Sequence, residues 1–507
     1  MRVKLPAVFT VEVKSRLGSI RQIAEPERVI AGNAIKYTLD RSVGHILRDE
    51  HDSNLLYLFS TGTRATSLPN DAPVLFANYE ITDAEQDLTN GKWISHPAMV
   101  SEAGTGASPA ERALKSWSNA FRYVEEDRER GVMGLRNPQI GALHAIHAHW
   151  STARETATVV MPTGTGKTET MLGVLTSARC YRVLVVVPTD ALRLQLSGKF
   201  ETLGLLKVAR GVLVESALRP VVGTLTSKPT TVEDVDGFFG NCNVIVTTSQ
   251  LLGTCAQVIQ ERIASLCSHL FIDEAHHAEA STWKALRERF AGKLVLQFTA
   301  TPFREDGQAI DGRLVYVYPL RKAQQEGYFR PIRFRKVSEF NADSGDREIA
   351  LAALDELDTD TTGRHIVMAR VGDTRRATKI LELYQSFGRH KAVAIHSRMS
   401  AKAQQDAKRQ LFDGSARIVV CVDMLGEGFD LPELKIAALH DIRKSLAVTL
   451  QLAGRFTRAR VDLGDPVFIA NIALIDAREE LRKLYAQDPD WNELLPTLSA
   501  TAIEVER

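Results

Sequence analysis

A glycine-rich loop has the residue types and spacing of a phosphate-binding site. It runs P-T-G-T-G-K-T at 162–168, between a short apolar run and a helical stretch. Gly164 and Gly166 let the backbone amides curve around phosphate oxygens, and the helix N-terminus adds the positive end of its dipole. Lys167 is expected to reach the β- and γ-phosphates, and the Thr168 hydroxyl to hold Mg²⁺. The residues expected to bind a nucleoside triphosphate are Thr163, Gly164, Thr165, Gly166, Lys167 and Thr168.

An acidic pair follows a second apolar run, in the segment L-F-I-D-E-A-H-H. Asp273 is placed to bind Mg²⁺ through its water shell, and Glu274 to polarise an attacking water. D-E-A-H alone could equally begin a surface helix, but downstream of a phosphate-binding loop the catalytic interpretation is favoured. A zinc site is disfavoured, because no other His or Cys lies at ligand spacing. We expect His276 instead to connect the acidic pair to Thr299 and Thr301.

Two arginines occur in the segment Q-L-A-G-R-F-T-R at 451–458. Arg455 and Arg458 are three residues apart, so on a helix they share a face. Guanidinium groups aimed at a γ-phosphate stabilise the charge that develops during phosphoryl transfer. Without the phosphate-binding loop, a basic helix face contacting solvent or a nucleic-acid backbone would be the better explanation.

The elements that must position these residues form two alternating sets. From about residue 133, and again from about 365, short apolar runs end in polar or glycine-rich turns and are separated by helical stretches. This pattern predicts an α/β fold with two parallel sheets covered by helices, joined near 319–334. Residues 1–131 read as a small strand-rich accessory domain, followed by a helix that Ser108 caps, with Pro109 first and Glu111 closing a capping box. The expected domains are 1–131, 132–325 and 326–507.

Composition describes an ordinary globular chain of 507 residues. Its 63 Lys and Arg nearly balance 62 Asp and Glu, so the net charge is +1 and any electropositive track must be local. The five scattered cysteines indicate reduced thiols rather than disulfides or a zinc site. The N-terminus lacks the apolar run of a signal peptide, and no segment is apolar for long enough to span a bilayer. We therefore expect a cytoplasmic protein with no membrane partner.

Together these motifs resemble the superfamily 2 helicases, the DEAD/DEAH class with two RecA-like lobes in tandem. The resemblance covers about 133–471, and Met161 stands where the strict loop pattern has a glycine, as is common in that superfamily's motif I. It implies that Gln139 reads the adenine edge of ATP and that motif V, at 423–430, contacts the nucleotide. The remaining residues that the resemblance assigns are Gly428 and Asp430 in the nucleotide site, Gln451 in coupling, and Thr189, Thr248 and Ser249 on nucleic acid. His396 and Ser397, at a strand end of the second set, are expected to contact nucleic acid as well.

The segment T-P-F-R at 301–304 narrows the resemblance further. With the motifs at 423–430 and 451–458, it is similar to the branch containing type III restriction subunits and related bacterial DNA translocases. That branch implies DNA rather than RNA as partner, ATP and Mg²⁺ as cofactors, a separate effector or nuclease subunit, and a setting in anti-phage defence or restriction. The E-V-K at 12–14 lacks the upstream acidic partner of a nuclease, so an exposed strand edge explains it better.

The predicted mechanism divides one ATP site between two lobes. Lys167 and Mg²⁺ hold the phosphates on one side and Arg455 with Arg458 on the other, so ATP biases a cleft between open and closed forms. One alternative is a nucleotide-gated clamp or sensor that closes on DNA without net movement and activates an effector. Another is an ATPase that acts on a protein or small molecule, which 451–458 argues against. Three basic residues alternate along a short stretch, and they could line the path of bound DNA or lie on an exposed strand edge: Arg333, Arg335 and Lys336.

Overall fold

The computed structural model describes most of the chain before residue 442. The described residues are 2–39, 42–49, 55–59, 72–77, 86–99, 106–162, 164–208, 211–275, 280–300, 311–328, 333–422, 431, 433–441, 464–471 and 473. The chain divides into two compact units, one of Met1–Leu135, Thr168–Asp273 and Ala278–Leu296, and one of Arg136–Lys167, Glu274–His277 and Gln297–Arg507. The three domain boundaries expected from the sequence stay a prediction.

The N-terminal residues form a seven-stranded sheet in the order β8-β1-β4-β5-β6-β7-β9. Its strands are β1 (Arg2–Leu5), β4 (Arg28–Leu39), β5 (Ser42–Asp49), β6 (Leu55–Phe59), β7 (Val74–Phe76), β8 (Gln86–Asp87) and β9 (Lys92–Ser95). β4 and β5 form a long antiparallel hairpin in which Gly32 pairs with Asp49. Val3, Leu47 and Leu58 belong to a buried apolar cluster of this sheet. The strand-rich character expected for this region is therefore present.

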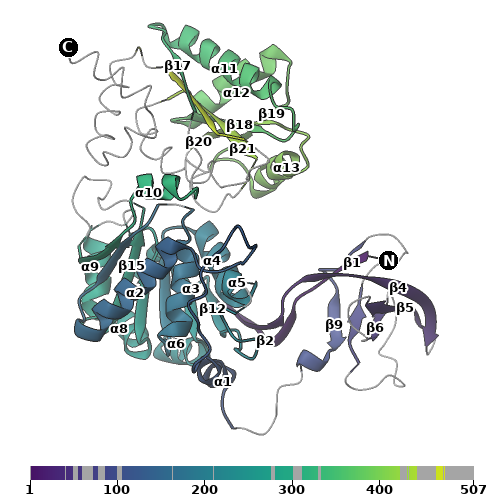
Figure 1. The fold of residues 1–507 in the computed structure, drawn as a ribbon, viewed down its shortest axis with the longest axis vertical. Helices are drawn as coiled ribbons and strands as arrows, with labels where there is room; N and C mark the ends of the chain where they lie inside the picture. The colour runs from purple at the N-terminus through teal and green to yellow at the C-terminus, as the bar shows by residue number, and fades with distance from the viewer. Residues whose placement is uncertain are drawn as a thin grey trace. The chain divides into compact units, whose positions relative to one another are not determined.

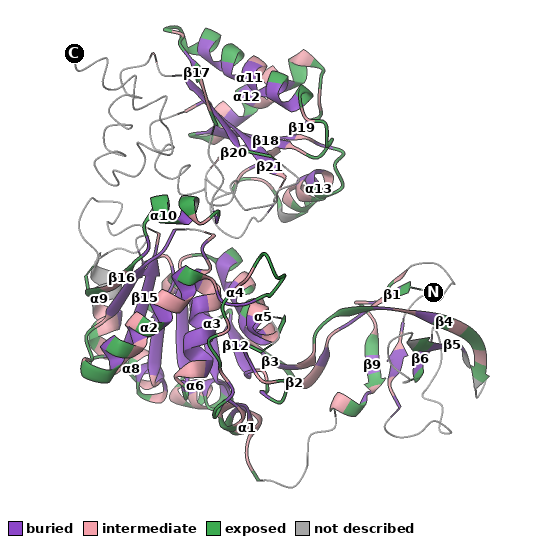
Figure 2. Ribbon diagram, viewed as in Figure 1, coloured by how far each residue is buried: buried purple, intermediate pink, exposed green. Residues whose placement is uncertain are grey.

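A nine-stranded sheet follows in the order β16-β10-β15-β14-β11-β13-β12-β3-β2. Its strands are β2 (Val8–Ser15), β3 (Gly18–Glu25), β10 (Ala157–Val160), β11 (Val183–Val187), β12 (Val222–Leu225), β13 (Val244–Thr248), β14 (His269–Ile272), β15 (Leu294–Thr299) and β16 (Arg313–Val317). β11 runs parallel to β13 and β14, β12 parallel to β13, and β10 parallel to β16. Every residue of β10 to β14 is buried, because helices cover both faces of a parallel sheet (Figure 2).

The hairpin of β2 and β3 lengthens this sheet beyond its parallel strands. β3 pairs antiparallel with β12, and β2 with β3. Two residues separate β1 from β2, and two separate β3 from β4. The same two-stranded ribbon therefore belongs to the N-terminal sheet at one end and to the nine-stranded sheet at the other (Figure 1). No sequence signal predicted this pairing.

Along the chain, the helices up to residue 325 lie before, between and after the strands that form most of the nine-stranded sheet. They are η1 (Pro97–Met99), α1 (Pro109–Ser116), α2 (Asn137–Thr152), α3 (Lys167–Ser177), α4 (Asp190–Thr202), α5 (Gly204–Val208), α6 (Val232–Phe239), α7 (Ser249–Gly253), α8 (Gln257–Leu266), α9 (Ala280–Arg289) and α10 (Leu320–Gln325). The predicted start of α1 is confirmed: the Ser108 hydroxyl accepts from the Glu111 amide, and the Glu111 carboxylate accepts from the Ser108 amide.

A third, six-stranded sheet lies further along the chain, in the order β17-β22-β21-β18-β20-β19. Its strands are β17 (Arg333–Val337), β18 (Ile366–Val371), β19 (Ala392–Ile395), β20 (Ile418–Val422), β21 (Leu434–Leu439) and β22 (Val467–Asn471), with helices α11 (Ala342–Asp358), α12 (Thr374–Phe387) and α13 (Ala401–Phe412). All of its strand pairs are parallel. Two parallel sheets with connecting helices confirm the predicted α/β class.

The five cysteines form no disulfide bonds. All five cysteines are buried free thiols, and burial raises the pKa of Cys267 to about 12. In the part of the chain whose structure is described, no helix combines the length and the apolar character needed to cross a membrane.

Candidate nucleotide site and nucleic-acid interface

The loop at 162–168 has the strand–loop–helix context that phosphate binding requires. β10 ends at Val160, and α3 begins at Lys167. Gly164 and Gly166 adopt φ angles of 91° and 99°, which side chains disfavour. Met161 is fully buried and is not among the residues of positive φ, so its position does not require the glycine of the strict pattern.

Thr165 stabilises the turn of this loop by hydrogen bonds within the loop. Its side chain is fully buried, and its hydroxyl donates to the Pro162 carbonyl at 2.7 Å. The Thr165 amide donates to the same carbonyl at 3.2 Å. Thr165 thus shapes the loop, and Thr163 lies outside the described residues.

Lys167 and Glu274 form the contact that joins the loop to the acidic motif. The Lys167 Nζ lies 2.5 Å from Glu274 Oε1, and their side chains are only 8% and 13% exposed. Glu274 adopts a φ of 49°, the left-handed region that costs a non-glycine residue of order 1 kcal/mol or more. The cation expected to hold phosphate therefore contacts the carboxylate expected to polarise water.

Asp273 and Thr168 are the residues expected to hold Mg²⁺. Asp273 follows β14 directly and is buried, and its amide donates to the Val186 carbonyl of β11 at 3.0 Å. Thr168 lies in the first turn of α3. A carboxylate and a hydroxyl are the hard oxygen ligands that Mg²⁺ prefers, so the donor set fits the ion.

Thr299 connects the strand of motif III to the phosphate loop. It is the fully buried last residue of β15, and its carbonyl accepts from the Met161 amide at 3.0 Å. His276 and Thr301, the other residues expected to couple these motifs, lie outside the described residues.

Gln139, the residue expected to read the adenine edge, is buried beside the phosphate loop. Its side chain is 1% exposed, its Oε1 accepts from the Arg136 amide at 2.8 Å, and its Nε2 donates to the Gly166 carbonyl at 3.5 Å. Arg136 Nη1 also donates to the loop, to the Gly164 carbonyl at 3.0 Å. Sequence reasoning missed Arg136, although it lies in the same L-R-N-P-Q segment.

The residues expected on nucleic acid lie at the carboxyl ends of parallel strands. Thr189 and Thr248 follow β11 and β13 and cap α4 and α7, each hydroxyl oxygen accepting a backbone amide at 3.3 Å. Ser249 is the first residue of α7. In the third sheet, His396 and Ser397 follow β19 in the same way. A hydroxyl group can both accept and donate a hydrogen bond, which is the chemistry that binding a phosphate oxygen requires.

The far half of the predicted nucleotide site falls outside the described residues. This holds for Gly428, Asp430, Gln451, Arg455 and Arg458. β20 ends at Val422, directly before motif V. The roles of these five residues stay predictions.

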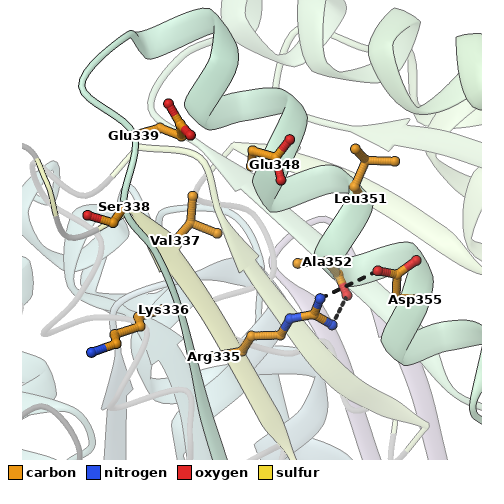
Figure 3. A pocket seen from close by; sticks show the side chains of 9 residues that line it. All are labelled: Arg335, Lys336, Val337, Ser338, Glu339, Glu348, Leu351, Ala352 and Asp355. Atoms are coloured by element: carbon orange, nitrogen blue, oxygen red, sulfur yellow. Dashed lines mark hydrogen bonds and ion pairs between the residues drawn. The ribbon is translucent and has the colours of Figure 1, made fainter.

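The arginines of β17 contact acidic side chains of α11. Arg333 forms a two-pronged ion pair with Glu356. Arg335 donates to the Ala352 carbonyl at 3.2 Å and to Asp355 at 3.4 Å, beside a pocket between β17 and α11 (Figure 3). β17 is also the edge strand of its sheet, so these contacts favour the strand-edge interpretation over a DNA path.

The E-V-K segment shows no nuclease geometry. It lies on β2, and Glu12 forms an ion pair at 3.4 Å with Arg21 of the neighbouring β3.

Two family models match the chain in the expected order. "Type III restriction enzyme, res subunit" matches 132–304, and "Helicase conserved C-terminal domain" matches 349–460. The first covers β10 to β15 of the nine-stranded sheet, and the second covers β18 to β21 of the six-stranded sheet. The chain belongs to the superfamily 2 helicases, in the type III restriction subunit branch. Both matches support an ATP-hydrolysing enzyme of helicase type.

Curated relatives of this helicase match only in part. The 51.5 kDa protein of Lactococcus phage (isolate 7-9) is 26% identical over 206 residues, which cover 37% of this chain and 46% of the phage protein. DEAD-box ATP-dependent RNA helicase 41 of Oryza sativa subsp. japonica is 27% identical over 97 residues, 19% of this chain and 17% of that protein. The chain thus spans less than half the length of each of these relatives.

A solved structure shares the fold over nearly the whole helicase. It is a fragment assigned as the HsdR subunit of a type I restriction enzyme from Vibrio vulnificus YJ016. The TM-score is 0.50 at 14% identity, over 94% of this chain and 86% of that one. The likeness confirms the architecture of two RecA-like lobes.

Proposed function

We propose that this helicase-type ATPase is a DNA translocase that couples ATP hydrolysis to movement on, or remodelling of, DNA. The observation that carries the proposal is the contact between Lys167 and Glu274, which brings the phosphate-binding and water-polarising groups together within a family that hydrolyses ATP. DNA is preferred to RNA because the first family model describes restriction enzymes, whose substrate is DNA.

In the first lobe, each proposed role follows from the chemistry of the side chain. Lys167 binds the β- and γ-phosphates, and Glu274 orients and polarises the attacking water. Thr168 and Asp273 would hold Mg²⁺, which supplies positive charge against the phosphate oxygens. A triphosphate that binds Lys167 competes with Glu274 for the ammonium, so binding releases the carboxylate toward water.

In the second lobe, Arg455 and Arg458 are proposed to stabilise the charge on the γ-phosphate, and Gly428 and Asp430 to contact the nucleotide. Closure of the cleft between the lobes would be coupled to the nucleotide site through four residues: Gln451, His276, Thr299 and Thr301. Hydrolysis removes the γ-phosphate that both lobes contact. The closed form is then no longer stabilised relative to the open form.

The nucleic-acid contacts are proposed at the carboxyl ends of parallel strands. Hydrogen bonds to the phosphates of the nucleic-acid backbone would come from Thr189, Thr248 and Ser249 in the first lobe. His396 and Ser397 would donate them from the second lobe. Such contacts carry no sequence information. Two groups of contacts that move relative to each other in each ATP cycle produce stepping along a strand.

The proposed biological setting is restriction or anti-phage defence, with a separate effector or nuclease subunit as partner. It is supported by the family model, which describes a subunit of a restriction enzyme.

The test is the ATPase rate without nucleic acid and with single-stranded DNA, duplex DNA or RNA, for the wild type and Glu274→Gln. We expect DNA to stimulate the wild type and the variant to lose hydrolysis by roughly 10²-fold or more. A rate that responds to RNA alone, or to neither, contradicts the choice of DNA. Displacement of a triplex-forming strand then separates translocation from a clamp that closes without moving.

A further inference from the structure

The edge strand β17 turns part of its backbone away from the six-stranded sheet. Among the strands that the structure describes, β17 has a neighbour on one side only, β22. The Arg333 amide donates to the Pro466 carbonyl at 2.9 Å, so the backbone groups of Arg333 face β22. The two strands pair in unbroken register from Arg333 to Val337, and successive residues of a strand turn their N–H and C=O groups to opposite sides. The backbone groups of Phe334 and Lys336 therefore point away from β22.

Backbone groups at such an edge can receive another extended chain. A row of N–H and C=O groups along a strand is a template for an added strand, which gains main-chain hydrogen bonds. Phe334 and Lys336 offer two donors and two acceptors, and Lys336 is exposed. A strand added here would turn its side chains alternately to the two faces of the sheet. The chemistry of those faces therefore decides which sequence fits.

The face of β17 toward α11 is acidic. Figure 3 shows a pocket on this face, and its volume of about 390 Å³ lies within the range of ligand pockets, roughly 300–1,000 Å³. Three carboxylates line it, those of Glu339, Glu348 and Asp355, beside the guanidinium of Arg335. Asp355 already pairs with Arg335 at 3.4 Å, whereas Glu339 and Glu348 form no ion pair with any residue that the structure describes. A basic side chain of the added strand would meet these two carboxylates.

The opposite face of β17 carries a positive charge. Side chains alternate along the strand, so Lys336 lies on the face away from Arg335, and Figure 3 shows the two side chains extending in different directions. Within the described part of the chain, Lys336 has no ion-pair partner. An acidic side chain directly opposite Lys336 on an added strand would pair with it. A lysine on an edge also disfavours pairing with other strands, so the match of charge makes this edge selective.

We propose that β17 binds a partner protein through an added strand, in which a basic residue faces the α11 pocket and an adjacent acidic residue faces Lys336. A nucleic acid is the poorer occupant, because its phosphates would meet the carboxylates of Glu339 and Glu348. The inference goes beyond the proposed ATPase. It assigns a docking surface for a protein segment, and it depends neither on the nucleotide site nor on DNA as the substrate.

The test uses two fluorescein-labelled peptides, Thr-Val-Glu-Arg-Val-Thr and Thr-Val-Arg-Glu-Val-Thr, titrated with the full chain by fluorescence anisotropy. The two orders present the charge pair correctly to β17 in a parallel and in an antiparallel added strand. We expect one order to bind about fivefold more tightly than Thr-Val-Ser-Ser-Val-Thr, which lacks both ion pairs. The same peptide N-methylated on both valines should lose binding, because the valines turn to opposite sides and one methyl group always blocks a main-chain hydrogen bond.

Lys336→Pro tests the outward backbone of β17 directly. Proline removes the Lys336 N–H, which faces away from β22, so the pairing within the sheet is retained. We expect peptide affinity to fall by about tenfold, because a hydrogen bond and a charge are lost together. Lys336→Thr keeps the N–H and removes only the charge, so it should lose about twofold to fivefold, as should Glu348→Gln. Glu382→Gln, on the exposed surface of α12, is the matched control and should bind as the wild type does.

Equal binding of the N-methylated peptide, or wild-type affinity in Lys336→Pro, would overturn the added strand. Failure of both peptide orders to bind would overturn it too, and weaker duplex DNA binding by Lys336→Thr would then place this stretch on a nucleic-acid path. These outcomes are separate from those that test the proposed function. The DNA-stimulated ATPase rate of Lys336→Pro should equal that of the wild type, and a wild type without such stimulation contradicts only the proposed function.

Discussion

Lys167 and Glu274 form an ion pair at the centre of the site, so the carboxylate competes with phosphate for the Lys167 ammonium. The carboxylate lies 2.5 Å from the ammonium that must bind phosphate. Replacing Glu274 with Gln keeps the shape but removes the competing negative charge. We therefore expect Glu274→Gln to bind ATP more tightly, by up to about tenfold, while it hydrolyses ATP far more slowly. Equilibrium titration with a mant-nucleotide and single-turnover hydrolysis measure the two effects separately.

Glu261→Gln provides the matched control for this prediction. Glu261 lies on α8, where it accepts a hydrogen bond from Gln257 on the exposed helix surface. The same charge change there should leave ATP affinity and hydrolysis unaltered. Weaker ATP binding in Glu274→Gln would mean that the carboxylate supports the loop rather than competing with phosphate.

The residues of the first half-site could be predicted because their requirements are local. The glycines at 164 and 166 adopt positive φ angles, and a helix begins at the lysine that follows. The place of Tyr328 could not be predicted. It contacts Arg136 from a position 192 residues further along the chain, and nothing in its own neighbourhood marks it as part of a nucleotide site.

At the scale of elements, one buried network ties α11, α12 and the end of β21 together. Asp346 of α11 accepts two hydrogen bonds from Arg376 of α12, at 2.7 and 2.9 Å, and one from His440 at 3.0 Å. His440 Nε2 in turn lies 3.2 Å from the Tyr384 hydroxyl. Burial alone would raise the pKa of Asp346, but the hydrogen bonds from His440 and Arg376 outweigh it and hold the pKa below its usual value.

Asp346→Asn should therefore destabilise the second lobe in a pH-dependent way. Breaking a buried pair costs about 3 kcal/mol of unfolding free energy near neutral pH. Because the pKa is lower in the folded state, the ionised group stabilises the fold above its unfolded pKa of about 3.9, and this is lost as the pH falls through the folded pKa. Thermal melts should show the largest gap between wild type and variant at pH 6–7 and a narrowing gap below about pH 4.

Asp343→Asn is the control on the same helix. Asp343 pairs with Lys379, but its side chain is 76% exposed, and exposed pairs contribute little. If the melting temperature falls equally in both variants, the buried network contributes no more to stability than the exposed ion pair.

The hairpin of β2 and β3 carries the second element-scale prediction. Gly18 opens β3 at a φ of 147°, and a Cβ there would lie 1.9 Å from the Thr224 carbonyl of β12. Gly18→Ala should therefore weaken the pairing of β3 with β12 by roughly 1–3 kcal/mol. Faster proteolytic release of the N-terminal sheet is the expected result. Gly198→Ala, on α4 with open space around it, should not change the rate.

Pairing over long sequence distances also limited what could be predicted about elements. The central parallel strands, such as β11 and β18, were foreseeable because each is a continuous apolar run, as strands buried on both faces are. The pairing of β3 with β12 joins segments about 200 residues apart, and β3 has the mixed polar pattern of a half-exposed strand. Its place in the sheet depends on contacts between residues far apart in the sequence. One of them is the hydrogen bond that the Arg219 guanidinium donates to the Ala24 carbonyl. No local sequence pattern predicts such contacts.

At the scale of the whole molecule, near-neutral charge shapes how the helicase can hold nucleic acid. With 63 basic and 62 acidic residues, the chain has no overall attraction for a polyanion. Most of the side chains proposed to contact nucleic acid are Thr and Ser, which release no counterions when they bind phosphate. Affinity should therefore depend less steeply on salt than it would for a lysine-lined groove.

This difference can be measured by titrating duplex DNA binding against salt for three variants. Ser249→Ala should weaken binding about twofold to tenfold at every salt concentration and leave the slope of log K against log salt unchanged, because one neutral hydrogen bond is lost. Arg398→Gln, at an exposed arginine beside Ser397, should reduce that slope by about 0.9, the value of one phosphate ion pair on duplex DNA. Lys115→Gln, on the exposed face of α1, should change neither quantity. If Ser249→Ala changes the slope while Arg398→Gln does not, the proposed path at the carboxyl ends of the strands is wrong, and the nucleic acid must be held by a different face.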